Sequence, residues 1–542
     1  MNAKNYIQVI VPLKLDWEPV YSVPEGLEVA EGDRVSVIFS GKEYISVVSK
    51  VGVTPSDGIS EAHIQPVLDI VDYLPRITEQ EMRFWKMIAS YYLCTLGEVY
   101  KSVYFQDQKP PRKWAPKDRS AIAAEPGLKQ ELETAFSGTL DAFSNGRTVL
   151  LHGAGQEART KLYLKLAVNA IKNGKSVLYL VPGIAISSLL EERIKEIFPD
   201  ACIYHSGQTA AKRRDIVLEA RQGRPMLVLG TRSSLFIPFS NLGLIIVDEE
   251  QDVFYKQDSP APRYHARECA IMLAWVCGAN VILGSSTPSL EALHNARTGL
   301  FADISLSREV ECPHPVTIID TSAERRKRGM VGEVSLKLLA EVKVVADSGG
   351  KILVVSWAEE PELQGVTYAT PVAVKSIPTD GYDLIAVLQA DTLIGRQDFR
   401  SDERALQLLR RLNATCPLVI QTKESSHPVF QALTKASEGL YDNMMAERKA
   451  FGYPPFTRMV KLELKDSDEN RQKLRARFLG NRVKEVLRPF SDPLILGPEK
   501  GEIRIFFKRD KNLTAGKQAL YKEVTSFELQ YSCHIIIDVD PV

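Results

Sequence analysis

The chain has 542 residues, 25% of them charged, and its 68 lysines and arginines balance its 68 aspartates and glutamates. This length predicts about three to four domains, and the neutral balance excludes a protein that binds nucleic acid through its overall charge, so any such surface must be local. The seven cysteines form no C-x-x-C pair and no apolar run reaches membrane-spanning length, which argues against a zinc ribbon and a membrane span and for a cytoplasmic protein with reduced thiols.

The N-terminal part of the chain is predicted to be β-rich and to end in helices. Alternation of apolar and polar residues, with Pro-Glu-Gly and Ser-Gly turn signals between the runs, predicts strands over 6–11, 33–39 and 44–51. Apolar residues at helical spacing predict a helix from Thr78 to Tyr92. Most residues of the following YYLCTLGEV string, 91–99, are expected to pack in a core.

Residues 106–126 are rich in proline and in basic residues, and they are predicted to be an extended linker because such a composition cannot bury a core. The alternative is that the basic residues around Trp114 follow a phosphate backbone while the ring stacks on a base. These basic residues are Lys109, Arg112, Lys113, Lys117 and Arg119.

A loop between a predicted strand, 148–151, and a predicted helix has the spacing of a phosphate-binding loop. The string GAGQEART matches G-x-x-x-x-G-K-T at Gly153 and Thr160, and Arg159 stands where the pattern has lysine. These three are the candidate nucleotide-binding residues. Ala158 replaces the second glycine and adds a Cβ where the backbone approaches the phosphates, and the planar arginine fork is not equivalent to a lysine ammonium. ATP binding is therefore expected to be weak or lost.

Three apolar runs predict parallel strands at 226–229, 244–247 and 281–283, and polar strings follow each of them: GTRSS, DEEQ and GSSTPS. Ligands of open α/β sheets bind beyond the carboxyl ends of the strands, so these loops describe one cleft. Asp248 and Glu249 directly follow a strand, which suits a hydrated Mg²⁺ and an attacking water. They are the candidate catalytic residues.

The segment 252–267 interleaves aromatic and basic residues, a pattern that suits base stacking combined with phosphate contacts. The alternative is a loop packed against the second lobe of the fold. The candidate DNA-binding residues of this segment and of the GTRSS string are Arg232, Ser233, Lys256, Arg263 and Arg267.

The remaining chain predicts a second α/β unit followed by an α+β domain. In the α/β unit, strands are predicted at 316–319, 352–355, 384–388 and 418–420, with helices near 334–345 and 401–412. In the last domain, single helices and strands are predicted to alternate. A basic cluster there is either a duplex-facing patch or a solvated face: Lys500, Arg504, Lys508, Arg509, Lys511 and Lys517.

The strings GTRSSLFIPFSNLGLIIVDEEQD, YKQ, RYHAR and GSSTPSLE resemble, in order and spacing, the motor core of the PriA family of superfamily 2 replication-restart helicases. The resemblance implies an α/β fold with two helicase-type parallel-sheet lobes, a β-rich N-terminal DNA-binding domain and an α+β C-terminal domain. The implied divisions are a 3′ DNA-end-binding-like domain at 1–105, the basic linker at 106–126, a degenerate lobe 1 at 127–305, a shortened lobe 2 at 306–426 and a C-terminal domain at 427–542.

Several family features are missing from this chain. The resemblance implies a winged-helix domain, zinc-binding cysteines and an arginine-finger string, and this sequence shows none of them. In addition, Gln251 stands where the family has the histidine that couples the ATP site to the DNA-facing loop. No zinc is therefore expected, and use of ATP and Mg²⁺ is doubtful.

Together these features predict a degenerate PriA-like protein that recognises branched or single-stranded DNA and helps to assemble the primosome with other replication-restart proteins, without ATP-driven unwinding. Two alternatives stay open. One is a helicase with residual ATP use through Arg159 and Asp248, and the other is an interaction scaffold that no longer binds DNA.

Overall fold

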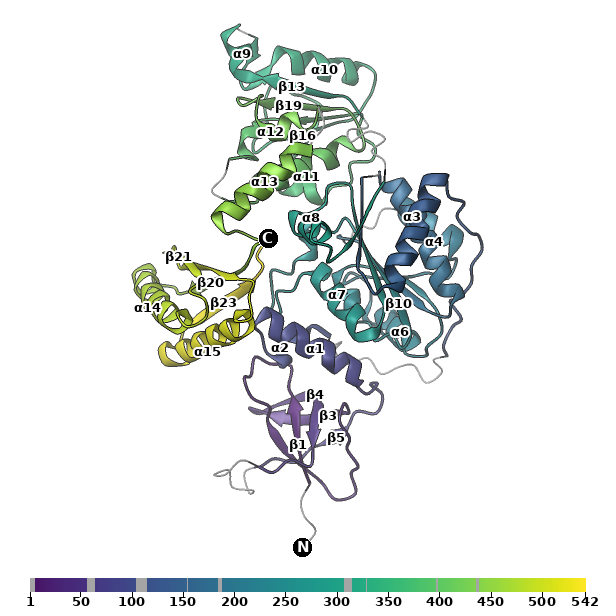
Figure 1. The fold of residues 1–542 in the computed structure, drawn as a ribbon, viewed down its shortest axis with the longest axis vertical. Coiled ribbons are helices and arrows are strands. Elements are labelled where there is room, and N and C mark those ends of the chain that lie inside the picture. Colours follow the sequence, from purple (N-terminus) through teal and green to yellow (C-terminus); the bar gives the residue numbers. More distant parts are fainter. Residues whose placement is uncertain are drawn as a thin grey trace.

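The computed structural model describes residues 5–55, 64–103, 115–153, 155–183, 188–306, 314–327, 329–395, 398–434 and 438–542. Within these residues, four sheets of four or more strands follow one another along the chain, and helices cover them (Figure 1). The two middle sheets are parallel and the first and last are antiparallel, which confirms the predicted fold class.

The N-terminal domain is a five-stranded antiparallel sheet, in the order β2-β1-β4-β3-β5, followed by two helices. The predicted strands and the predicted helix are confirmed, and the helix starts at a capping box between Thr78 and Glu81. Its elements are β1 (Asn5–Ile10), β2 (Val20–Val23), β3 (Arg34–Phe39), β4 (Lys42–Val51), β5 (Asp69–Ile70), α1 (Glu79–Tyr92) and α2 (Leu96–Val103).

Lobe 1 is a seven-stranded parallel sheet in the order β12-β6-β11-β10-β7-β9-β8. The strands predicted before GTRSS, DEEQ and GSSTPS are β9, β10 and β11, so these strings do leave the same edge of one sheet. Its strands are β6 (Val149–His152), β7 (Ser176–Leu180), β8 (Cys202–Tyr204), β9 (Leu227–Gly230), β10 (Leu242–Asp248), β11 (Asn280–Ser285) and β12 (Ala302–Ser305). Its helices are α3 (Gln130–Ser144), α4 (Gln156–Lys172), α5 (Ser188–Ile197), α6 (Ala210–Ala220), α7 (Ala266–Cys277) and α8 (Leu290–Arg297), with 3₁₀ turns η2 (Arg232–Phe236) and η3 (Val253–Tyr255).

Lobe 2 is a five-stranded parallel sheet in the order β13-β19-β18-β16-β17. The helix predicted near 334–345 begins at Leu336, because the Ser335 hydroxyl caps it by accepting a hydrogen bond from the Leu338 amide. The strands are β13 (Val316–Asp320), β16 (Ile352–Val355), β17 (Thr367–Ala369), β18 (Leu384–Val387) and β19 (Leu418–Thr422), beside a small hairpin of β14 (Met330–Val331) and β15 (Val334–Ser335). The helices are α9 (Thr321–Arg326), α10 (Leu336–Asp347), α11 (Ser401–Asn413) and α12 (Pro428–Gln431), with 3₁₀ turns η4 (Ala373–Ser376) and η5 (Ala390–Thr392).

The C-terminal domain is a four-stranded antiparallel sheet in the order β21-β22-β20-β23, with two long helices packed on it. The predicted alternation of single helices and strands is wrong at one point, since β21 and β22 form a hairpin. Lys500 and Gly501 both have positive φ, 48° and 82°, which is the backbone of a two-residue type I′ turn. The elements are α13 (Glu438–Phe451), β20 (Thr457–Lys465), α14 (Glu469–Leu487), β21 (Leu494–Glu499), β22 (Glu502–Lys508), α15 (Leu513–Tyr531) and β23 (His534–Val539).

Helix α1 joins the units, because it packs on α7 of lobe 1 and on β23 of the C-terminal domain. In Figure 1 it lies between the purple N-terminal sheet and lobe 1, beside the yellow C-terminal domain. The described part of the predicted linker, 115–126, has no helix or strand. It lies against lobe 1, where Arg119 pairs with Glu219. Lys109, Arg112, Lys113 and Trp114 lie outside the described residues.

Candidate nucleotide and DNA sites

The predicted phosphate-binding loop has the strand-loop-helix context that such a loop requires. Strand β6 ends at His152, and α4 starts directly after Gly155. Gly153 has φ +98°, and a Cβ there would collide with the carbonyl oxygen of Leu306. The first glycine of the pattern is therefore kept for a backbone reason, whatever the loop binds.

The Arg159 side chain contacts both predicted catalytic acids. Its side chain is 0% exposed, its Nε lies 3.3 Å from Asp248 Oδ1, and its Nη2 donates to Glu249 Oε1. The second carboxylate oxygen of Glu249 accepts a hydrogen bond of 2.7 Å from Gln251, the residue that replaces the family's histidine. Tyr163 donates to Asp248 Oδ1 at 3.2 Å. The structure thus joins these predicted site residues in one internal network, the arginine plug (Arg159, Asp248, Glu249 and Gln251).

Burial and ion pairing act in opposite directions on the titratable groups of the plug. Burial raises the pKa of Asp248 to about 6, although the adjacent Arg159 opposes the rise. Burial acts to lower the pKa of Arg159, but Glu249 and Asp248 outweigh it and the net pKa is raised, so the guanidinium stays charged. Thr160, whose hydroxyl would serve Mg²⁺ in a working loop, is buried beside it. In this arrangement a guanidinium neutralises the carboxylates that a metal ion would need.

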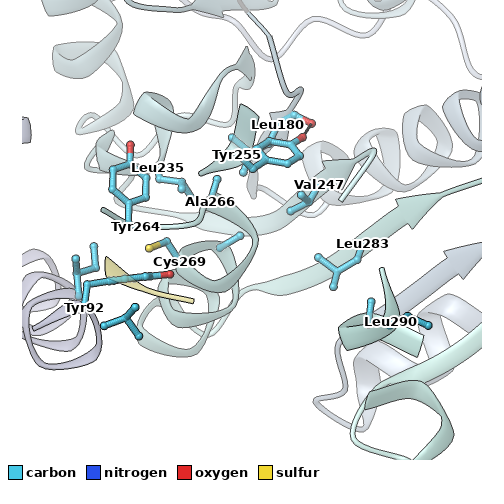
Figure 2. Close-up of a cluster of buried hydrophobic side chains, with 14 of the residues drawn as sticks. Tyr92, Leu180, Leu235, Val247, Tyr255, Tyr264, Ala266, Cys269, Leu283 and Leu290 are labelled. Atoms are coloured by element: carbon cyan, nitrogen blue, oxygen red, sulfur yellow. Dashed lines mark hydrogen bonds between the residues drawn. The ribbon is translucent and has the colours of Figure 1, made fainter. Parts of the chain in front are cut away.

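The aromatic residues of 252–267 belong mainly to the protein core. Tyr255 is buried and its hydroxyl donates to the carbonyl oxygens of Leu180, at 3.0 Å, and Asp248, at 2.6 Å. Tyr264 is 2% exposed. Figure 2 shows both rings in one apolar cluster that also contains Tyr92 of α1. Neither ring is available for stacking on a base.

Two of the predicted DNA contacts are internal ion pairs instead. Lys256 is 3% exposed and its Nζ lies 2.7 Å from Asp538 Oδ1 and 2.6 Å from the Val539 carbonyl oxygen. Arg267 donates to Glu250 at 2.7 Å and to Ser289 at 2.8 Å. Both are held by groups of their own chain, which argues against the predicted phosphate contacts. The alternative of a packed loop fits better. The loop contacts α1 through His265, whose amide donates to the Tyr92 hydroxyl at 3.0 Å, and the C-terminal domain through Lys256. Val253 and His265 also line a pocket with Arg400 and Glu403 of lobe 2.

The other three candidate DNA-binding residues are half-buried, and the hydroxyl oxygen of Ser233 is itself buried. Arg232 is half-buried and donates to the carbonyl oxygens of Phe254, at 2.9 Å, and Lys256, at 3.2 Å. The Ser233 hydroxyl has no hydrogen-bond partner among the described residues. Arg263 is half-buried, and no hydrogen bond or ion pair holds its guanidinium within the described part of the chain. A role of these residues in DNA binding stays a prediction.

A second buried ion network joins lobe 1, lobe 2 and the C-terminal domain. Glu291 of α8 lies 2.7 Å from Arg400, at the start of α11, and 3.5 Å from Arg448 of α13. Arg448 also pairs with Glu403 of α11, and the Phe399 ring lies under both guanidinium groups. The sequence showed only that the strings around 398–404 resemble the family. Their partners come from other domains, so no local pattern could have identified the network.

A pocket of about 200 Å³ lies where the N-terminal domain meets α15. It is lined by the segment after β1, which contains Asp16 and Trp17, by the turn between α1 and α2, and by Tyr521. Trp17 is 60% exposed, and its ring is tilted against that of Phe39, with ring centroids 6.2 Å apart. Gly97 lets α2 pack closely on the segment after β1 at this pocket, because a Cβ there would collide with backbone carbonyl oxygens of that segment. The sequence predicts a 3′ DNA-end-binding-like domain at 1–105 but singles out no residue of this pocket, because Tyr521 comes from the other end of the chain.

Three further observations bear on cofactors and location. The described cysteines, Cys94, Cys202, Cys269, Cys277, Cys416 and Cys533, are free thiols, and Cys312 lies outside the described residues. Among the described residues, no group of three or more His, Cys, Asp and Glu is arranged to hold a metal ion. No helix in the described part of the chain is long and apolar enough to cross a membrane.

Comparison with known proteins supplies the family context. A family model described as the PriA 3′DNA-binding domain (3′BD) matches residues 8–104. Replication restart protein PriA of Rickettsia conorii is 31% identical over 353 residues, which are 64% of this chain and 52% of that protein. PriA of Haemophilus influenzae is 36% identical over 230 residues, 42% of this chain and 30% of that protein. The chain spans about half the length of the curated relatives it matches. The solved structure of the DUF1998 helicase MrfA matches with 14% identity and a TM-score of 0.34 over 59% of this chain and 55% of that chain.

Proposed function

Because this chain is a PriA-like protein, we propose that it is a DNA-binding replication-restart factor that recognises forked or single-stranded DNA without ATP-driven unwinding. In this proposal it acts in the cytoplasm and assembles with other primosome proteins. The N-terminal domain supplies recognition of DNA 3′ ends, and the two lobes serve as a binding platform rather than as a motor.

The arginine plug is the main observation in support of the proposal that this protein does not unwind DNA. A nucleotide with Mg²⁺ would have to displace Arg159 from two carboxylates, and breaking a buried ion pair costs about 3–5 kcal/mol. Ordinary micromolar to millimolar ATP binding corresponds to only about 4–8 kcal/mol. The arginine-finger string, which supplies about 10³–10⁵ in rate in active enzymes of this type, is also missing after Leu412.

The ion network around Glu291 supports the same conclusion. A helicase works by opening and closing its lobes, and here buried ion pairs tie both lobes to the C-terminal domain. Because each partner is desolvated, separating the lobes would leave charges uncompensated. Such a connection suits a fixed platform.

The N-terminal pocket supports DNA-end binding. The Asp16 carboxylate can accept a hydrogen bond from a free 3′-hydroxyl, and the exposed Trp17 ring offers a stacking surface for the last base. Every residue that lines the pocket except Tyr521 lies within 8–104, the residues that the 3′DNA-binding family model matches.

DNA binding is tested with a labelled fork and a labelled single strand in a salt titration. The logarithm of the affinity is expected to fall against the logarithm of the salt concentration with a slope of about −0.7 to −0.9 per phosphate contacted. Arg263→Gln should flatten the slope, whereas Arg325→Gln, an exposed arginine of lobe 2, should not. Absent or salt-insensitive binding in the wild type would favour the scaffold alternative.

ATP turnover is tested by phosphate release with and without DNA. We expect background rates in both cases. DNA-stimulated release that disappears in Asp248→Asn would establish the alternative of a residual helicase and refute the proposed mechanism.

A further inference from the structure

The N-terminal pocket is built by two domains that are far apart in the chain. Tyr521 of α15 lines it, and its hydroxyl donates a hydrogen bond of 2.7 Å to Asp16 Oδ1 across 505 residues of sequence. The family model that matches 8–104 covers Asp16 but not Tyr521. The C-terminal domain therefore contributes a wall to a pocket that the N-terminal domain alone would leave open.

One face of α15 follows the segment after β1. Lys14 and Glu528 form a second contact, with Nζ 2.7 Å from Oε2. Tyr521 and Glu528 are two helical turns apart and so project from the same side of α15. The contact to Asp16 is thus part of a continuous interface and not an isolated approach of two exposed side chains.

The hydrogen bond leaves the carboxylate free on one side. Oδ2 of Asp16 makes no hydrogen bond within the described residues, and the side chain is exposed to the pocket. Burial, and then the bond to Asp16, raises the pKa of Tyr521, so the phenol remains a donor at neutral pH. Tyr521 consequently fixes one oxygen of the carboxylate and leaves the other for a ligand.

We propose that Tyr521 is a positioning residue for DNA 3′-end recognition: it orients Asp16 so that the free carboxylate oxygen meets a 3′-hydroxyl. This inference rests on the proposed binding of 3′ ends by the N-terminal domain. A hydroxyl donates to the carboxylate, whereas a 3′-phosphate is a second anion and is repelled. The C-terminal domain thereby sets the selectivity of the pocket for extendable ends over blocked ends.

The test compares binding of two otherwise identical forks whose nascent strand ends in a 3′-hydroxyl or a 3′-phosphate. The wild type is expected to prefer the hydroxyl end by about tenfold or more, because of the repulsion between two anions. Tyr521→Phe keeps the ring and removes the donor, and it should lower this preference by about fivefold, the effect of one hydrogen bond. Glu528→Gln is the matched control, since it weakens the same interface at Lys14, keeps an oxygen to accept from the Ile535 amide and should leave the preference unchanged.

A double-mutant cycle separates positioning from packing. In an Asp16→Asn background, adding Tyr521→Phe should not change the preference further, because the carboxylate that Tyr521 orients is already gone. An unchanged preference in Tyr521→Phe, an equal loss in Glu528→Gln, or additive effects of Asp16→Asn and Tyr521→Phe would each overturn the inference. A wild type without any preference for hydroxyl ends would instead refute the proposed 3′-end recognition itself, and the inference would fall with it.

Discussion

Replacing Arg159 by methionine separates a structural arginine from a nucleotide-binding one. Methionine has a similar length and no charge, so Arg159→Met leaves Asp248 and Glu249 next to an apolar side chain. Removing one partner of a buried ion pair costs about 3–5 kcal/mol, and the side chain of Arg159 is fully buried. At about 2–4 °C per kcal/mol for a domain of about 150–250 residues, the melting temperature of lobe 1 should fall by about 6–20 °C.

Scanning calorimetry without nucleotide measures this effect directly. Lys161→Met is the matched control, because Lys161 is on the same helix and pairs with Glu157 in an exposed i,i+4 contact of 3.0 Å. Exposed pairs of this kind contribute at most about 1 kcal/mol, so the control should melt close to wild type. Adding Asp248→Asn to Arg159→Met should recover part of the loss, because one uncompensated carboxylate is then removed.

An arginine that faces the phosphates would behave differently. Arg159→Met would then melt within about 2 °C of wild type, and millimolar ATP with Mg²⁺ would raise the melting temperature of the wild-type protein by mass action. Either result would refute the arginine plug as the reason for lost ATP use.

Three further predictions concern the N-terminal pocket and the ion network around Glu291, and a fourth concerns the cysteine pattern. Gly97→Ala should destabilise the N-terminal domain by about 1–3 kcal/mol in urea unfolding, because its Cβ meets the carbonyl oxygen of Leu13, and it should weaken binding of 3′ ends. Arg448→Met should cost about 3–5 kcal/mol by leaving Glu403 unpaired and should increase protease cleavage between the lobes. Burial acts to raise the pKa of Glu291, but the surrounding arginines outweigh it and lower the pKa below 4.5. A carboxyl with a lowered pKa contributes stability above its ordinary pKa and loses it on acidification, so Glu291→Gln should flatten the fall in melting temperature below about pH 4.5. Elemental analysis should find no stoichiometric zinc, and chelators should leave thermal unfolding unchanged.

The sequence alone determined that three polar strings of lobe 1 leave the same edge of one sheet. Short apolar runs bounded by turn signals predict buried parallel strands, and the polar strings that follow such strands gather at the edge where the strands end. Glycine at 153 and the cap at Thr78 are likewise local requirements of the backbone, readable from a few neighbouring residues.

Only the tertiary structure decided what the charged residues of the cleft do. A lysine or arginine in a basic, aromatic segment has the same sequence pattern whether it faces a phosphate or a buried carboxylate. Lys256 finds Asp538 on the last strand, and Arg159 finds two acids at the end of β10. Ion pairing and pocket walls depend on distance in space, and Tyr521 reaches Asp16 only where the C-terminal domain packs on the N-terminal domain. The periodicity of apolar residues predicts which face of a helix or strand is buried. It does not predict which oppositely charged residue, distant in sequence, pairs with a charge on that face.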